Sequence, residues 1–235
     1  MDDLRHPEYL PRIVERINLL APDLVVIAGD LADGKAAELA PQLEALRGLK
    51  ARYGVFGVPG NHEYYYSGYH DYMAYLPTLG VTMLENSHRM IRPDFAVAGI
   101  TDPAARKHRL PEPEISAALR GIPKTAFVLL IAHQPQHCVA ASKLGVDLQL
   151  SGHTHGGLVW GIGPLIVGRN GGFVAGLYRV GDTALYVSRG SAFRSRGRWV
   201  TVWRIGVPPE ITLLILRRPT HRQPHSSGMS NLQPQ

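Results

Sequence analysis

The stretch LQLSGHTHGG, residues 148–157, decides the fold class, because a short apolar run ends there in a glycine and two histidines. Apolar runs of this length, closed by glycine, are typical of strands buried within a sheet. Three other runs end in a similar way: VVIAGD (25–30), GVPGNH (57–62) and LLIAH (129–133). Ligands collect at the carboxyl ends of strands in open α/β sheets, so we expect these four ends to meet at one edge.

The side chains at these strand ends can bind metals. They are Asp30, Asn61, His62, His133, His153 and His155. Each has an ordinary alternative, since Asp30 could cap the next helix, Asn61 could form a turn and His133 could be a core histidine. The two histidines of GHTH could likewise lie in a surface turn. These alternatives do not explain why all six residues lie at the ends of strands. Their shared position therefore favours a metal site.

The mixture of ligand types narrows the choice of metal. Imidazole, carboxylate and amide oxygen without thiolate suit Mn²⁺, Fe or Zn²⁺ rather than a cysteine-rich structural zinc site. A metal in such a site acidifies a bound water and stabilises charge on the substrate, which fits metal-assisted hydrolysis. His62 lies beside the candidate ligand Asn61 and could donate a proton to a leaving oxygen or bind a phosphoryl oxygen.

The rest of the pattern predicts one α/β domain over residues 1–216. Apolar spacing predicts helices at 10–20, 39–46, 114–119 and 137–144. Apolar runs predict strands within 23–30, 53–63, 95–102, 126–134, 147–155 and 210–216. Gly181-Asp182 predicts the turn of a hairpin within 176–188. Residues 217–235 are polar and contain proline, which predicts a disordered basic tail.

The composition is that of an ordinary globular protein, with 45% hydrophobic and 19% charged residues in 235. We expect no membrane span and no signal peptide, so the sequence leaves the location open. The single cysteine, Cys138, excludes an internal disulfide. The net charge of +6 fits either a solvated basic face or a phosphate-bearing or anionic-lipid ligand, and no nucleic-acid-binding module is recognisable.

With GDLAD, GNHE, AHQP and SGHTHGG in this order, the chain resembles the calcineurin-like metallophosphoesterases from about Asp23 to Leu216. The stretches GNHEYYYSG, GLYRVG, LYVSRG and PPEITLL look most like a bacterial phosphodiesterase branch whose members are often membrane-associated or exported. The resemblance implies a four-layer αββα sandwich. It also implies a metallophosphoesterase that uses two divalent metal ions.

The resemblance assigns a role to each matching residue. Asp30 would bridge both metals, and Asn61, His133 and His153 would complete the shell of one. His155 would bind the other metal, and His62 would be the catalytic histidine. A hydroxide between the metals would attack phosphorus in line.

One motif of this family does not match. Its D-x-H, on a first strand ahead of the opening helix, has no counterpart among Asp2, Asp3 and His6. We therefore expect an N-terminally incomplete domain that lacks its first strand and keeps only Asp30 and His155 for the second metal. Activity of the chain as it stands is expected to be impaired.

The substrate is weakly encoded. A phosphodiester is implied by the resemblance, with a lipid-linked or nucleotide-sugar one as the finer expectation. Tyr65, among the tyrosines that follow His62, could stack on the substrate, line a lipid-facing groove or simply pack. Arg189 could bind phosphate.

Three functions stay open. The chain could be a metal-dependent phosphodiesterase, a non-catalytic metal-binding protein, or a basic module that binds anionic lipid or nucleic acid. Association with a membrane surface is a separate expectation. His62 has no ligand role, so its presence favours the enzyme. The sequence does not indicate an oligomeric state.

Overall fold

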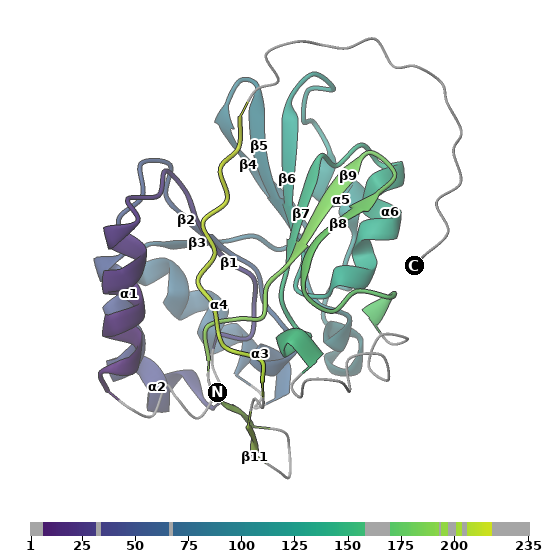
Figure 1. Cartoon of the computed structure of the whole chain (residues 1–235). Coiled ribbons are helices and arrows are strands. Elements are labelled where there is room, and N and C mark those ends of the chain that lie inside the picture. Colours follow the sequence, from purple (N-terminus) through teal and green to yellow (C-terminus); the bar gives the residue numbers. More distant parts are fainter. Residues whose placement is uncertain are drawn as a thin grey trace.

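Two β-sheets form the centre of the computed structural model, which describes residues 7–31, 34–65, 68–157, 170–192, 194–196, 201–203 and 206–217 (Figure 1). The smaller sheet is parallel and has the order β1 (Val25–Ile27), β2 (Val55–Gly57), β3 (Val81–Met83). The larger sheet has the order β4 (Ser87–Arg92), β5 (Phe95–Gly99), β6 (Phe127–Ile131), β7 (Leu148–Ser151), β9 (Thr183–Val187), β8 (Gly176–Val180). Its inner strands β5, β6, β7 and β9 are parallel, and β4 and β8 are antiparallel edges. A separate antiparallel pair joins β10 (Arg194–Arg196) to β11 (Thr201–Trp203).

Helices cover the outer faces of both sheets. The smaller sheet packs against α1 (Tyr9–Leu19), α2 (Ala36–Leu43) and α4 (Tyr69–Thr78). The larger sheet packs against α5 (Ile115–Leu119) and α6 (Cys138–Lys143). The short helix α3 (His62–Tyr65) follows β2 directly.

The inner faces of the two sheets share one apolar core. Phe56 and Val58, in and just after β2, pack with Val97, Leu129 and Ile131 of the larger sheet. Burial of these side chains stabilises the contact by roughly 1.5–3 kcal/mol for each large aliphatic or aromatic group. The expected four-layer αββα arrangement is therefore confirmed.

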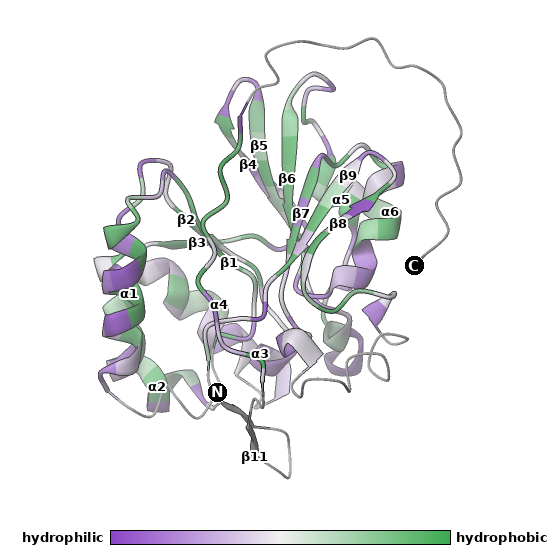
Figure 2. Ribbon diagram, in the orientation of Figure 1, coloured by the Kyte–Doolittle hydropathy of each residue, from purple (hydrophilic) through white to green (hydrophobic). Residues whose placement is uncertain are grey.

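The first helix shows how the local sequence produces this layering. Leu10 and Val14 are buried one turn apart, while Arg12 and Glu15 face solvent, and Figure 2 shows the resulting two-sided colouring of α1. The helix ends before Ala21, which adopts a left-handed backbone conformation (φ 44°) and donates its N–H to Asn18. This arrangement is a frequent way to close a helix.

The predicted last strand, 210–216, is wrong. In the described residues 206–217 the chain is extended but forms no strand, and it runs in front of β1 (Figure 1). Its backbone contact is the bond from Glu210 N–H to Gly190 O, 2.9 Å. The apolar pattern of this segment is suited to a strand, but a strand forms only where a partner backbone pairs with it. Leu213 and Ile215 remain 49% and 68% exposed.

Four strands escaped prediction. β3, β10 and β11 are only three residues long each, and β4 has the polar sequence SHRMIR of an edge strand. The hairpin β8–β9 forms as predicted, with Gly181 at φ 58° in its turn. The domain boundary at residue 216 stays a prediction, because the tail from residue 218 lies outside the described residues. Among the helices of the described part, none is long and apolar enough to cross a bilayer.

Candidate metal centre

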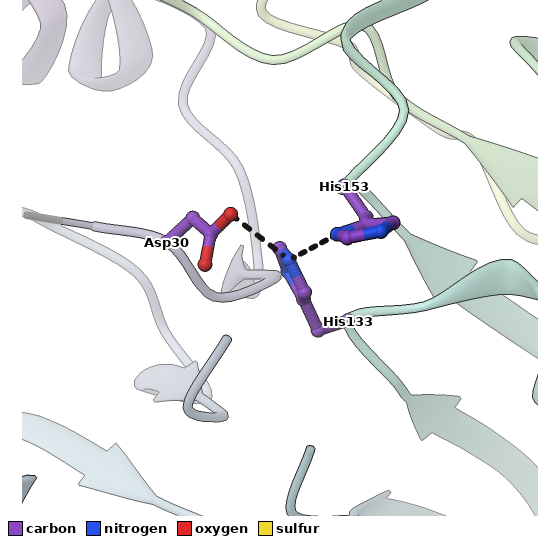
Figure 3. Close-up of side chains that lie close together, drawn as sticks. All are labelled: Asp30, His133 and His153. Carbon is purple, nitrogen blue, oxygen red and sulfur yellow. Dashed lines mark hydrogen bonds and ion pairs between the residues drawn. The ribbon is translucent and has the colours of Figure 1, made fainter. Parts of the chain in front are cut away.

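Residues from both sheets converge where their strands end. Asp30 follows β1, Asn61 follows β2, His133 follows β6 and His153 follows β7. Asp30, His133 and His153 each offer a ligand atom within 4.8 Å of the others (Figure 3). Asn61 joins them through hydrogen bonds to both histidines. We call these residues the four-ligand cluster.

The spacing of the ligand atoms in this cluster suits one divalent ion. His133 Nε2 lies 3.0 Å from Asp30 Oδ2, 3.1 Å from Asn61 Oδ1 and 3.1 Å from His153 Nδ1. His153 Nδ1 lies 2.8 Å from Asn61 Oδ1. Atoms that bind a metal at about 2.1 Å in directions at right angles are about 3 Å apart. The residues present therefore fit a metal ion.

Two further observations support this fit. Asp30 Oδ2 is buried, and in the described part of the chain its polar neighbours are the rings of His133 at 3.0 Å and His62 at 3.8 Å. His133 places Nδ1 2.7 Å from the carbonyl oxygen of Ala28, so that Nδ1–H donates and Nε2 remains for a metal. Such an outer hydrogen bond fixes both the tautomer and the orientation of a ligand histidine.

The charges of the cluster depend on one another in the metal-free protein. Burial raises the pKa of Asp30, but the attraction of His133 and His62 outweighs it and holds this pKa well below its ordinary value. Burial lowers the pKa of His133, but the Asp30 carboxylate raises it to about 9. Burial and the charge of His133 lower the pKa of His153 to about 4. In the metal-free protein the cluster thus holds an anionic Asp30, a protonated His133 and a neutral His153, and His133 would lose its additional proton when it binds a metal.

The backbone at the site adopts conformations that are costly for side-chain-bearing residues. Asp30, His153 and His155 have φ of 52°, 69° and 50°, in the left-handed region. Residues held there cost of order 1–3 kcal/mol each and persist where the surroundings enforce them. Such strain is concentrated at functional sites.

Glycine at position 60 is required by a close approach between two loops. A Cβ on Gly60 would lie 2.2 Å from Asp30 Oδ1 and 2.4 Å from Asp30 N. The turn of PGNH thus brings its backbone against the Asp30 loop.

Glu63 belongs to the site, although it was not among the residues predicted for it. Glu63 is 2% exposed, and its carboxylate accepts hydrogen bonds from the N–H groups of Asp30 (3.0 Å), Leu31 (2.7 Å) and Gly60 (2.7 Å). The available signal was a charged residue directly after the histidine of GNHE, in a stretch otherwise poor in charge.

His62 and Tyr65 lie at the rim of the cluster. The backbone N–H of His62 donates to Asp30 Oδ1 at 2.9 Å, and its ring Nε2 is 3.8 Å from Asp30 Oδ2. The Tyr65 ring lies 5.1 Å from the His62 ring, and its hydroxyl accepts a hydrogen bond from Asn61 Nδ2 at 2.9 Å. Tyr65 is 54% exposed, so its outer face is open to a ligand.

His155 and Arg189 lie farther from the cluster. His155 is outside the compact group but lines the same cavity of about 1000 Å³ as Asp30, His133 and His153. Arg189 also lines this cavity, and its guanidinium binds Glu210 with Nε and Nη2 each 2.6 Å from Oε2. The Arg189 side chain therefore already has an anionic partner, and its role toward a substrate stays a prediction.

Known proteins resemble this chain in sequence. The pattern of the calcineurin-like phosphoesterase family matches residues 5–157. A zebrafish (Danio rerio) transmembrane protein with metallophosphoesterase domain is 36% identical over 220 residues, covering 89% of this chain and 49% of that protein. An uncharacterized metallophosphoesterase of Campylobacter jejuni is 32% identical over 213 residues, covering 90% of this chain and 55% of that protein.

A more remote likeness is found among solved structures. A phosphopantetheinyl hydrolase from Mycobacterium tuberculosis has a TM-score of 0.46 and 14% identity, over 71% of this chain and 78% of that one. The chain spans about half the length of the curated relatives it matches. Because the family pattern covers more than half of the chain, the chain belongs to the calcineurin-like phosphoesterase family.

Proposed function

We propose that this domain hydrolyses a phosphodiester and that Asp30, Asn61, His133 and His153 hold one divalent ion, Mn²⁺, Fe or Zn²⁺. Membership in the family supports metal-dependent phosphoester hydrolysis. The observation that carries the assignment of ligands is their spacing, 2.8–3.1 Å between neighbouring atoms from loops of both sheets.

Each residue has a distinct task in this proposal. When bound, the ion would acidify a water and offset negative charge on the phosphate. Asp30 and the three other ligands hold it between the sheets. His62 is the candidate general acid, because its ring lies beside Asp30 Oδ2 without belonging to the cluster, and donates a proton to the leaving oxygen. Tyr65 orients Asn61 through its hydroxyl and borders the substrate.

The second ion implied by the resemblance has fewer ligands among the described residues. Asp30 and His155 both line the cavity beside the four-ligand cluster. We assign these two residues to it, and this second site is incomplete.

The cavity beside the cluster supports a substrate with an apolar group. Its walls include Leu10, Ile13 and Ile17 of α1 together with Leu213 and Leu214. A lipid-linked phosphodiester would place its phosphate at the cluster and its chain along these walls, whereas a nucleotide sugar would leave them unused. The exposed Ile215 and Leu216 also support contact with a membrane surface.

The test combines cleavage with metal analysis. With Mn²⁺, bis(4-nitrophenyl) phosphate should be cleaved faster than 4-nitrophenyl phosphate, and Asp30→Asn should lose both this cleavage and the bound ion. A tightly bound ion without turnover would instead indicate a non-catalytic metal-binding protein. Salt-sensitive binding to anionic vesicles that ignores chelators would indicate the binding module.

A further inference from the structure

The carboxylate of Glu63 joins the two loops that carry Asp30 and Asn61. One oxygen accepts from Leu31 N–H, while the other accepts from both Asp30 N–H and Gly60 N–H, at 2.7–3.0 Å. The first two donors lie after β1 and the third lies after β2. One buried side chain therefore fixes the distance between two ligand-bearing loops.

The loop after β1 is shaped to receive this carboxylate. Gly29 and Asp30 both have positive φ, 83° and 52°. The N–H groups of Asp30 and Leu31 point to the same side, where they bind one anion together. Glu63 supplies that anion from within the chain, which helps to keep Asp30 in its left-handed conformation.

The hydrogen bond between Glu63 and Asp30 involves the backbone N–H of Asp30 and does not occupy its carboxylate oxygens. A second link between the same loops runs from His62 N–H to Asp30 Oδ1 at 2.9 Å. Because Glu63 binds the backbone of residue 30 instead of its side chain, Oδ2 remains directed to His133 at 3.0 Å. Glu63 is itself not part of the compact group of ligand atoms.

We propose that Glu63 is a positioning residue that sets the geometry of the metal ligands Asp30 and Asn61 by clamping their backbones together. This inference rests on the proposed metal-dependent function. Outer residues of this kind change metal affinity by about 10–100-fold when they are mutated.

The change Glu63→Gln tests the clamp with little change in volume. The amide oxygen of glutamine can accept the hydrogen bonds of one carboxylate oxygen. Its NH₂ group then takes the place of the other oxygen and faces a backbone N–H there, so that two donors meet and no hydrogen bond forms. We expect the loops to separate and Co²⁺ to bind about 10–100-fold more weakly, with an altered visible absorption spectrum. Glu44→Gln is the matched control, because Glu44 also accepts hydrogen bonds from Arg47 and Tyr75 but lies on the surface.

The measurement is a Co²⁺ titration of the whole chain, followed by its absorption spectrum, well below the unfolding temperature of each variant. A purely structural role for Glu63 would lower that temperature and leave affinity and spectrum unchanged, and this result would overturn the inference while the proposed function stands. Absence of Co²⁺ binding by the unmodified chain would overturn both. If Glu63→Gln does not fold, Glu63→Asp keeps the charge but is one methylene shorter, and the same weakened binding and altered spectrum are expected.

Discussion

The close contact at Gly60 gives the sharpest prediction about the site. In Gly60→Ala the new methyl would lie 2.2 Å from Asp30 Oδ1 and 2.4 Å from Asp30 N. Gly152→Ala is the matched control. Gly152 also lies in a ligand loop, and its added methyl would meet its nearest neighbour, Ala28 O, at 3.6 Å, an ordinary contact. Neither glycine has φ in the left-handed region, so the two variants differ in the space available and not in backbone strain.

The magnitude follows from the overlap. Because Cβ atoms are essentially never found closer than 3.0 Å to such neighbours, the two loops must separate by roughly an ångström. Inserting a methyl group into a filled interior costs about 1–3 kcal/mol. For a domain of this size, each kcal/mol lowers the unfolding temperature by about 2–4 °C, so we expect Gly60→Ala to unfold about 2–12 °C lower. The displaced Asp30 should also weaken metal binding.

The assay is thermal unfolding by circular dichroism, with and without Mn²⁺, on both alanine variants and the unmodified chain. We expect Gly152→Ala to remain close to the unmodified chain. If Gly60→Ala unfolds at the same temperature as Gly152→Ala and binds Mn²⁺ equally well, the loops are not in the close contact described, and the argument for glycine at this position fails.

Three further predictions concern single groups or the metal. His62→Ala should lower kcat by about 10²–10⁴-fold and keep metal affinity, because the bond to Asp30 comes from the backbone of residue 62; a loss of bound metal in a titration would contradict this. Chelation should lower the unfolding temperature, since an ion at a hundred times its Kd adds about 2.7 kcal/mol of stability; equal calorimetric scans with and without EDTA would argue against the site. Burial raises the pKa of Glu210, but hydrogen bonds from Arg189 and Tyr186 outweigh it and hold that pKa below its ordinary value. This stabilisation is present above the unfolded-state pKa and is lost as the pH falls through the folded-state pKa, so the deficit of Glu210→Gln in urea unfolding should shrink from about pH 7 to about pH 3.

The convergence of the ligands could be predicted from the sequence because it follows from topology. Asp30, Asn61, His133 and His153 each lie two to four residues beyond the end of a short apolar strand, and parallel strands present their carboxyl ends at one edge. This prediction could be made without knowing the order of the strands or which strands belong to which sheet. The structure adds that two ligands come from each sheet.

Two features escaped prediction because each depends on which distant group a backbone N–H or C=O binds. The segment 210–216 has the composition of a strand, yet in the described residues it contacts Gly190 through one backbone bond and remains extended. Glu63 acts on N–H groups some thirty residues away, and no pattern of side chains marks those groups. The left-handed conformations of Asp30 and His153 also escaped prediction, because residues with a side chain rarely adopt this region of φ and ψ.

The division of the candidate ligands between the two sheets would give a bound ion a structural role as well. Asp30 and Asn61 belong to loops of the smaller sheet, and His133 and His153 belong to loops of the larger one. Elsewhere the sheets are joined by the apolar contacts around Phe56 and Leu129, which are not directional. In the metal-free protein the Asp30 carboxylate, 3.0 Å from Nε2, raises the pKa of His133 to about 9, so this histidine carries an additional proton. An ion would replace this proton with bonds to both sheets and fix their relative position at the catalytic edge. Metal binding should therefore order the interface between the sheets, and hydrogen exchange at the ends of β2 and β6 should slow when Mn²⁺ is added.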